Sequence, residues 1–245
     1  MTWIDLNADL GEGAGSDDDL LAIVSSASIA AGGHAGDAAS IRRALKACKA
    51  RGIRAGAHPG YADRENFGRQ RLAIPRRALL DQLRQQMFLI RHIAAETGTA
   101  LTYVKLHGAL ANEAAESLDL SLELFATIQD IDPRLAVLAL DNSRQVDAAQ
   151  ALGQTVIREA YADRAYLADG MLAPRSMEGA VIHDVDQVVE RCLRLAQSGE
   201  VVAIDGTVLK SAARSICLHG DTPGAVDMAR EVRDALAEHG VTIKA

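Results

Sequence analysis

The chain has 245 residues, 49% of them hydrophobic, and this length suits one α/β barrel or two small domains. Its 33 acidic and 26 basic side chains give a net charge of -7, which argues against a nucleic acid or an anionic membrane surface as the main partner. The sequence contains neither a membrane-spanning apolar stretch nor the basic and apolar start of a signal peptide. We therefore expect a cytoplasmic protein that binds small molecules or other proteins.

Short apolar segments alternate with segments of helical period, which is typical of a parallel sheet with crossover helices. In chain order, strands are expected at Ile4–Ala8, Ser28–Ala31, Ile53–Ala57, Thr102–Leu106, Leu135–Leu140, Thr155–Ala160, Val201–Ile204, Ser215–Leu218 and Val241–Lys244. Apolar residues at helical spacing, each time followed by glycine, predict helices over residues 41–48, 79–90, 185–192 and 225–236.

This succession of seven or eight strand-helix units suits a closed (β/α) barrel. An open doubly wound sheet would give a similar pattern, and periodicity alone leaves both possible. We find no linker, low-complexity tract or charge block, so the prediction is one domain over residues 1-245.

Polar and titratable residues occur at the carboxyl end of nearly every predicted strand. They are Asn7, Asp9, Glu12, His34, Asp37, His58, Lys105, His107, Asp141, Asn142, Glu159, Asp163, Asp205, His219 and Asp221. In a parallel α/β protein these ends converge on one face, where side chains from different strands can surround one ligand. The pattern therefore predicts a shared site.

Four of the seven histidines, His34, His58, His107 and His219, belong to these strand ends and have glycine close by. Each by itself could be a turn residue hydrogen-bonded to the backbone, but four at equivalent positions indicate a site. The other three histidines, at positions 92, 183 and 239, are expected to be solvated or packed away from this face.

Lys105 lies in an apolar strand, where an ammonium without a partner would be costly to bury. It must meet a phosphate, a substrate carboxylate or a protein carboxylate, and the purely structural interpretation is an ion pair with Glu159 or Asp9. The sequence contains neither GxGxxG nor GxxxxGK[ST], so a nucleotide-binding phosphate loop is not expected. The three cysteines are isolated and are expected to be reduced and mostly structural.

Several motifs, in order along almost the whole chain, resemble the LamB/YcsF family, whose members are called A subunits of 5-oxoprolinase. They are DLNADLGE (5–12), GGHAGD (32–37), GAHPGY (56–61), VKLHGAL (104–110), EAYADR (159–164), PRS (174–176) and LHGDTPG (218–224). The chain departs from the family at Ala31 and Gly33, where Cys and Phe are common, at Leu106, where Pro is common, and at Ala111, where Tyr is common.

The resemblance implies a seven-stranded barrel similar to those of some glycosidases and polysaccharide deacetylases. It also implies ATP-dependent cleavage of 5-oxoproline to glutamate, with ATP bound mainly by two partner subunits, B and C, which phosphorylate the lactam. Candidate catalytic residues are Asp9, Glu12, His34, His58, Lys105, His107, Glu159 and His219. Candidate substrate-binding residues are Asn7, Asp163, Arg164, Arg175 and Asp221.

Within this scheme, opening a lactam needs a general base and cationic groups for the developing charge. Asp9, Glu159 or one of the histidines are candidates for the base, while Lys105, Arg164 and Arg175 are candidates for binding phosphate or the substrate carboxylate.

Two other functions remain open at this point. One is a metal-dependent hydrolase or deacetylase, in which Asp9, His34 and His58 bind a divalent cation that activates water. The other is a lactam-binding subunit without catalytic activity, suggested by the changes around His34. The sequence does not decide whether a divalent metal is required.

Overall fold

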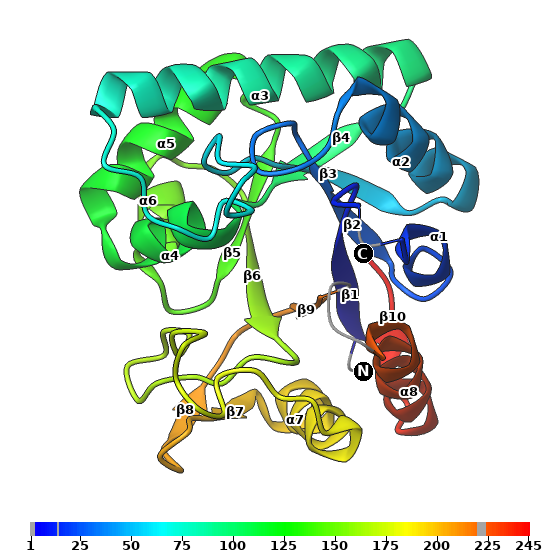
Figure 1. Ribbon diagram of the computed structural model, residues 1–245. Helices are drawn as coiled ribbons and strands as arrows, with labels where there is room; N and C mark the ends of the chain where they lie inside the picture. Colours follow the sequence, from blue (N-terminus) through cyan, green and yellow to red (C-terminus); the bar gives the residue numbers. More distant parts are fainter. Residues whose placement is uncertain (1–2, 14, 220–223) are drawn as a thin grey trace.

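The computed structural model describes residues 3–13, 15–219 and 224–245. Seven parallel strands close into a barrel in the order β1-β2-β3-β4-β5-β6-β9, because β9 pairs with both β6 and β1 (Figure 1). The strands are β1 Trp3–Leu10, β2 Ser26–Ala30, β3 Arg54–His58, β4 Leu101–Val104, β5 Ala136–Leu140, β6 Val156–Tyr161 and β9 Ser215–Leu218. The predicted seven-stranded (β/α) barrel is confirmed.

Helices connect the barrel strands and cover the outside of the barrel (Figure 1). They are α1 Asp17–Leu20, α2 Ala38–Arg51, α3 Arg76–Thr97, α4 Gly108–Glu116, α5 Leu118–Ile131, α6 Arg144–Ala151, α7 Val185–Ser198 and α8 Ala225–Glu238. The four helices predicted from apolar spacing correspond to α2, α3, α7 and α8. Gly52, Gly98 and Gly199 end three of them at φ of 68°, 63° and 62°, the left-handed conformation that favours glycine. None of the described helices is long and apolar enough to cross a membrane.

The prediction of a barrel strand at Val201–Ile204 is wrong. Its first residues belong to β7, Glu200–Val202, which pairs antiparallel with β8, Val208–Lys210, in a separate two-stranded sheet. Ile204 and Val208 are about half exposed, so this segment is apolar without being part of the barrel wall. The weak last strand is present as β10, Thr242–Ile243, which pairs with β1.

Strand β1 divides its side chains between the two faces of the barrel wall, as the period of two along a strand requires. One face belongs to the apolar core beneath the helices and carries Ile4, Leu6, Ala8 and Leu10. The alternate residues are polar and contact side chains from other strands across the interior: Asp5, Asn7 and Asp9. The interior of the barrel is therefore polar on this side.

A small apolar group fills another part of the interior, formed by Tyr103, Ala136 and Leu138 with Ile157 packed against it. A Cβ at Gly56 would lie 2.2 Å from the Tyr103 ring, so only glycine on β3 leaves room for that ring. Tyr103 and its neighbours thus close part of the barrel interior, while the charged residues occupy the side nearer to β1 and β9.

Candidate active site

A cavity of about 410 Å³ opens at the carboxyl ends of the barrel strands. Its lining includes Asp9, Glu12, His58, Arg69, His107, Asn112, Tyr161, Arg164, Arg175 and His219. His34, Lys105 and Glu159 are buried, and each contacts a side chain or network that reaches the cavity. All eight candidate catalytic residues thus lie in or directly beside one cavity.

Lys105 is the central cation of this network. Its Nζ lies 3.0 Å from Asp9 Oδ1 and 2.9 Å from Glu159 Oε1, and only 2% of the side chain is exposed. Cys217 Sγ is also 3.0 Å from Nζ, and the ring of Tyr161 lies beneath the ammonium, with its centroid 5.1 Å away. The ion pair that the sequence suggested for Lys105 is therefore present with both carboxylates.

Asn7 connects Lys105 to the polar residues that lie deeper in the barrel interior, behind the cavity. Its Nδ2 donates to Glu159 Oε1 at 2.9 Å and to Ser215 Oγ at 2.8 Å, and its Oδ1 accepts from Lys105 at 3.3 Å. Ser215 in turn donates to Asp5 Oδ2 at 2.5 Å. Asn7 is fully buried and does not line the cavity, so the structure places it behind the site rather than at a substrate-binding surface.

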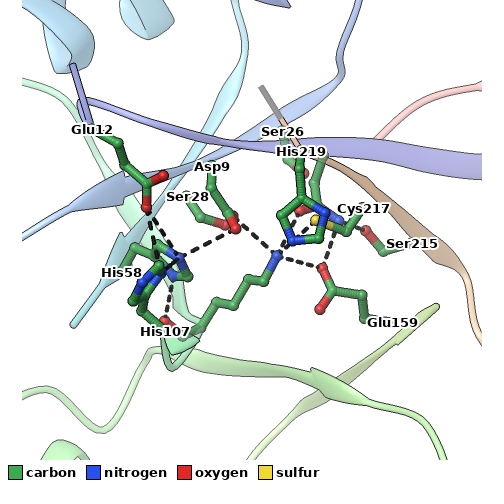
Figure 2. A network of polar contacts seen from close by, with 12 residues as sticks. Asp9, Glu12, Ser26, Ser28, His58, His107, Glu159, Ser215, Cys217 and His219 are labelled. Carbon is green, nitrogen blue, oxygen red and sulfur yellow. Dashed lines mark hydrogen bonds and ion pairs between the residues drawn. The ribbon is translucent and has the colours of Figure 1, made fainter. Parts of the chain in front are cut away.

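His58 and His107 are held by backbone carbonyls. His58 Nδ1 donates to the carbonyl oxygen of Lys105 at 2.8 Å, and His107 Nε2 donates to that of Phe67 at 2.9 Å. Their other ring nitrogens, His58 Nε2 and His107 Nδ1, are 3.0 Å apart (Figure 2). Asp9 Oδ2 lies 3.3 Å from the same His58 nitrogen, which connects the histidines to the lysine network.

Glu12 and His34 complete the histidine side of the site. Glu12 Oε1 lies 2.8 Å from His34 Nε2, 3.4 Å from His107 Nδ1 and 3.8 Å from His58 Nε2. The His34 and His107 rings are stacked, with centroids 3.5 Å apart and planes only 5° from parallel. In Figure 2, Glu12, His58 and His107 lie together on one side of Asp9, whereas Glu159, Cys217 and Ser215 lie on the other.

The charges of Asp9 and Lys105 stabilise each other. Burial alone would raise the pKa of Asp9, but the nearby His58 and Lys105 hold it well below its ordinary value. Burial alone would lower the pKa of Lys105, but Asp9, Cys217 and Glu159 raise it well above its ordinary value. Both groups are therefore ionised at neutral pH.

The histidines differ strongly from one another. Burial and the neighbouring His58 lower the pKa of His34 to about 2, so His34 is neutral and its contact with Glu12 is a hydrogen bond rather than an ion pair. Burial also lowers the pKa of His107 well below its ordinary value. For His58, the opposing charge of Asp9 outweighs burial and raises the pKa. Burial and the charge of Asp9 raise the pKa of Glu12.

The two predicted substrate-binding arginines lie at the cavity in different ways. Arg164 is buried and lines the cavity, but it donates to the carbonyl oxygens of Ala173 and Ala180, which holds the segment after β6 in place. Arg175 lines the cavity and is exposed. Arg69, which the sequence did not single out, joins them at the lining.

His219 and Asp163 form a pair at the rim, with Nδ1 of His219 at 2.8 Å from Asp163 Oδ1. Burial alone would raise the pKa of Asp163, but the interaction with His219 lowers it. Asp163 does not line the cavity and instead orients His219, which does. Asp221, the last predicted substrate-binding residue, lies outside the described residues.

Some residues expected at strand ends serve the fold. Asp37 caps α2 by accepting from the backbone N–H of Ser40 at 2.7 Å. Asp141 accepts from Arg158, Ser211 and the backbone N–H of residue 212, and Asp205 accepts from the Thr207 N–H in the β7–β8 turn. The expectation that these carboxylates belong to the shared site is wrong. The three remaining histidines, at positions 92, 183 and 239, are exposed, as expected.

Sequence reasoning missed Tyr161, Cys217 and the Phe67 carbonyl. Tyr161 and Cys217 alternate with buried apolar residues on β6 and β9, so the period of two could have assigned both to the barrel interior. The Phe67 carbonyl reaches His107 from a loop without regular period, and Phe67 has a φ of 55° that is rare outside glycine. No sequence signal indicates that contact.

Comparison with known proteins shows what this chain is related to. Residues 4–245 match the LamB/YcsF family. The chain belongs to this family. The 5-oxoprolinase A subunit 1 of Agrobacterium fabrum (strain C58 / ATCC 33970) is 43% identical over 249 residues, covering 100% of this chain and 98% of that protein. The 5-oxoprolinase A subunit of Neisseria meningitidis serogroup A / serotype 4A (strain DSM 15465 / Z2491) is 41% identical, with 100% of both chains covered.

Two solved structures resemble this chain to different degrees. The crystal structure of the lactam utilization protein from Thermus thermophilus matches this chain with a TM-score of 0.91 and 35% sequence identity, over 99% of both chains. A GH20 β-N-acetylhexosaminidase from Streptomyces coelicolor A3(2) gives a TM-score of 0.54 at 11% identity, over 96% of this chain and 63% of that one. The second likeness concerns the fold alone, and it agrees with the predicted similarity to glycosidase barrels.

Proposed function

We propose that this chain is the A subunit of an ATP-dependent 5-oxoprolinase and opens the activated lactam of 5-oxo-L-proline to give L-glutamate. The observation that carries the proposal is the Asp9–Lys105–Glu159 arrangement beside the cavity, in a chain whose full-length relatives are named as A subunits of 5-oxoprolinase. A metal-dependent deacetylase and a binding-only subunit are not favoured, because those relatives are named for the oxoprolinase. The names alone do not assign roles to residues, and geometry supports the following ones.

Asp9 is the general base in this proposal. It is ionised, it lines the cavity, and Lys105 fixes one of its oxygens. Glu159 is 1% exposed and does not line the same cavity, while Glu12 is already engaged by His34. A water held by Asp9 would attack the ring carbon of the phosphorylated lactam as its proton moves to the carboxylate. The ring C–N bond then breaks as the nitrogen takes a proton, and hydrolysis of the remaining acyl phosphate gives glutamate and inorganic phosphate.

Cationic groups at the cavity provide the second part of the reaction. As charge develops on the ring nitrogen beside the phosphate of the activated lactam, fixed cations and hydrogen-bond donors stabilise it more than water does. Arg69 and Arg175 line the cavity and suit the phosphate on an activated lactam or the substrate carboxylate. The rim pair of His219 and Asp163 is placed to donate or accept a proton there.

ATP enters the proposal through partner subunits B and C. The chain contains no phosphate-loop motif, and the cavity suits a small lactam, so ATP would be bound and used mainly by the partners. Free, buried cysteines are compatible with the cytoplasm, where we place the assembly.

The test is glutamate release from 5-oxoproline by this chain alone and by the chain reconstituted with the two partner subunits. We expect little or no release by the isolated chain, with or without ATP, and turnover by the complex. Asp9→Asn should lower turnover of the complex by about 100-fold or more, the usual loss for a general base. As a control, Asp205→Asn changes an exposed residue in a turn and should leave turnover unchanged. Robust turnover by the isolated chain, or full activity of Asp9→Asn, would overturn the proposal.

A further inference from the structure

Four donor side chains gather on one side of the cavity. Glu12, His34, His58 and His107 each direct one ligand atom into a space where all these atoms lie within 4.8 Å of one another. The three histidines are buried, and Glu12 is nearly so. Imidazole and carboxylate are the ligands that zinc and related divalent ions take in proteins.

The hydrogen bonds of His58 and His107 show which nitrogens are available. A backbone carbonyl can only accept, so His58 Nδ1 and His107 Nε2 must each carry a hydrogen. In the neutral rings, the remaining nitrogens are then lone pairs, and these two lone pairs face each other at 3.0 Å. A cation at His58 Nε2 removes this repulsion: a proton in the metal-free protein, which Asp9 Oδ2 at 3.3 Å from that nitrogen favours, or a divalent metal ion in its place.

The distances among three donors fit a metal ion. His58 Nε2, His107 Nδ1 and Glu12 Oε1 are separated by 3.0, 3.4 and 3.8 Å. For a tetrahedral ion with bonds of about 2.0 to 2.1 Å, neighbouring ligand atoms should lie about 3.3 Å apart. His58 and His107 each donate a hydrogen bond to a backbone carbonyl from the other ring nitrogen. Hydrogen bonds of this kind usually orient histidines that bind a metal.

His34 has a different place in this arrangement. Its ring is stacked on that of His107 at 3.5 Å and nearly parallel, so an ion in the plane of one ring lies out of the plane of the other. His34 instead donates Nε2–H to Glu12 at 2.8 Å and does not line the cavity. It orients the carboxylate ligand, as outer contacts do at other metal sites.

A second group of donors at the cavity, Asp9, Cys217 and His219, is less suitable. The ammonium of Lys105 lies 3.0 Å from both Asp9 Oδ1 and Cys217 Sγ, so a cation already occupies the space between them. A divalent ion there would face a buried positive charge at close range.

We propose that Glu12, His58 and His107 bind one divalent transition-metal ion, with Zn²⁺ as the best match, and that its open position faces the cavity. All three ligands line that cavity, as an ion that meets substrate or water requires. The proposal that a metal ion binds here rests on the geometry of the donor atoms alone. A role of the ion in polarising the lactam or its attacking water rests on the proposed function.

The test is metal binding by the isolated full-length chain, measured without partner subunits. After chelator treatment, Zn²⁺ titration followed by calorimetry should give one ion per chain with a Kd below about 1 µM. Co²⁺ in the same site should show the intense visible absorption of a four-coordinate ion. Failure to bind either ion stoichiometrically overturns the proposal, whatever glutamate assays of the complex show.

Variants locate the site. His107→Gln and Glu12→Gln should each weaken Zn²⁺ binding by at least about 100-fold, while His34→Gln, which removes an outer contact, should weaken it by about 10- to 100-fold. His219→Gln belongs to the other donor group and should bind Zn²⁺ like the parent. Normal binding by His107→Gln, or loss of binding in His219→Gln alone, would overturn the assignment. Circular dichroism checks folding, and the parent titration decides the proposal if a ligand variant does not fold.

Discussion

Lys105 shows how much of a single residue's environment can be predicted from sequence. An ammonium inside an apolar strand predicts a partner, and the structure supplies two carboxylates, Asp9 and Glu159. Sequence could not show that both would be there, because the choice depends on which strands face each other across the barrel.

Lys105→Met should abolish glutamate release by the reconstituted complex and also lower the thermal midpoint. The stability loss follows because Asp9 and Glu159 would remain buried without their cation. The double change Lys105→Met with Glu159→Gln removes one of these unpaired charges, so it should recover part of the midpoint without recovering activity. Full activity of the double variant would show that Lys105 serves the fold and not the reaction.

The cysteines offer a second test at this scale. Burial raises the pKa of the Cys48 and Cys192 thiols to about 12, and burial raises that of Cys217 well above its ordinary value. Because the thiolate is the reactive form, the folded chain should react very slowly with a disulfide reagent at pH 8. All three thiols should react in denaturant, where they are exposed. Rapid reaction of one thiol in the folded protein would contradict this burial.

At the scale of elements, sequence predicted the barrel wall better than the connections. Apolar runs and helical spacing identified the strands and α2, α3, α7 and α8, because these elements bury one continuous face against the core. Residues Val201–Ile204 were predicted as a barrel strand because they are as apolar as the barrel strands. In the structure, their first residues pair antiparallel with β8, outside the barrel. Pairing partners are a tertiary property that composition does not contain.

Asp37 gives a test of an element end. Asp37→Ala should lower the thermal midpoint by about 2 to 4 °C, the usual effect of losing one helix cap in a chain of this size. The midpoint falls because the hydrogen bond from the Ser40 N–H is lost. Asp37 is exposed and lies away from the cavity, so activity in the complex should be unchanged. Asp37→Asn keeps a capping oxygen and should retain most of the midpoint.

The same cap has a predictable pH dependence. Hydrogen bonds from the Ser40 backbone and hydroxyl lower the pKa of Asp37 in the folded protein. A lowered folded pKa contributes stability above the unfolded value of about 3.9, and this contribution is lost as pH falls through the folded value. The difference in midpoint between the parent and Asp37→Ala should therefore shrink in acid. A difference that stays constant down to pH 2 would contradict this explanation.

At the scale of the whole molecule, convergence of the strand ends explains why a shared site could be predicted without knowing any contact. Asp9, His58, Glu159 and His219 are far apart in sequence, yet parallel strands carry all of them to one end of the barrel. The division of the site into a lysine side and a histidine side could not be predicted, because it depends on side-chain direction and on the loop that carries Phe67.

The two ends of the chain meet in the same sheet. Trp3 pairs in register with Thr242, and β9 closes the barrel by pairing with β1. The sole tryptophan, Trp3, lies against Arg214 and Lys244, so its fluorescence reports this closure. Far-ultraviolet circular dichroism is a different signal, because it reports all the helices around the barrel, including α3 and α5 on the other side of the barrel in Figure 1.

We propose that residues 1–245 form one domain and predict a single cooperative unfolding transition. Opening the contact between β1 and β9 would expose the polar interior and remove the Ser215 hydroxyl that bonds both Asp5 and Asn7, so the closure and the rest of the barrel should unfold together. Denaturant titrations followed by Trp3 fluorescence and by circular dichroism should give coincident midpoints and slopes. Trp3→Phe provides the control that the fluorescence change comes from that residue. A fluorescence midpoint well below the dichroism midpoint would show that the closure opens separately, and the chain would then contain more than one folding unit.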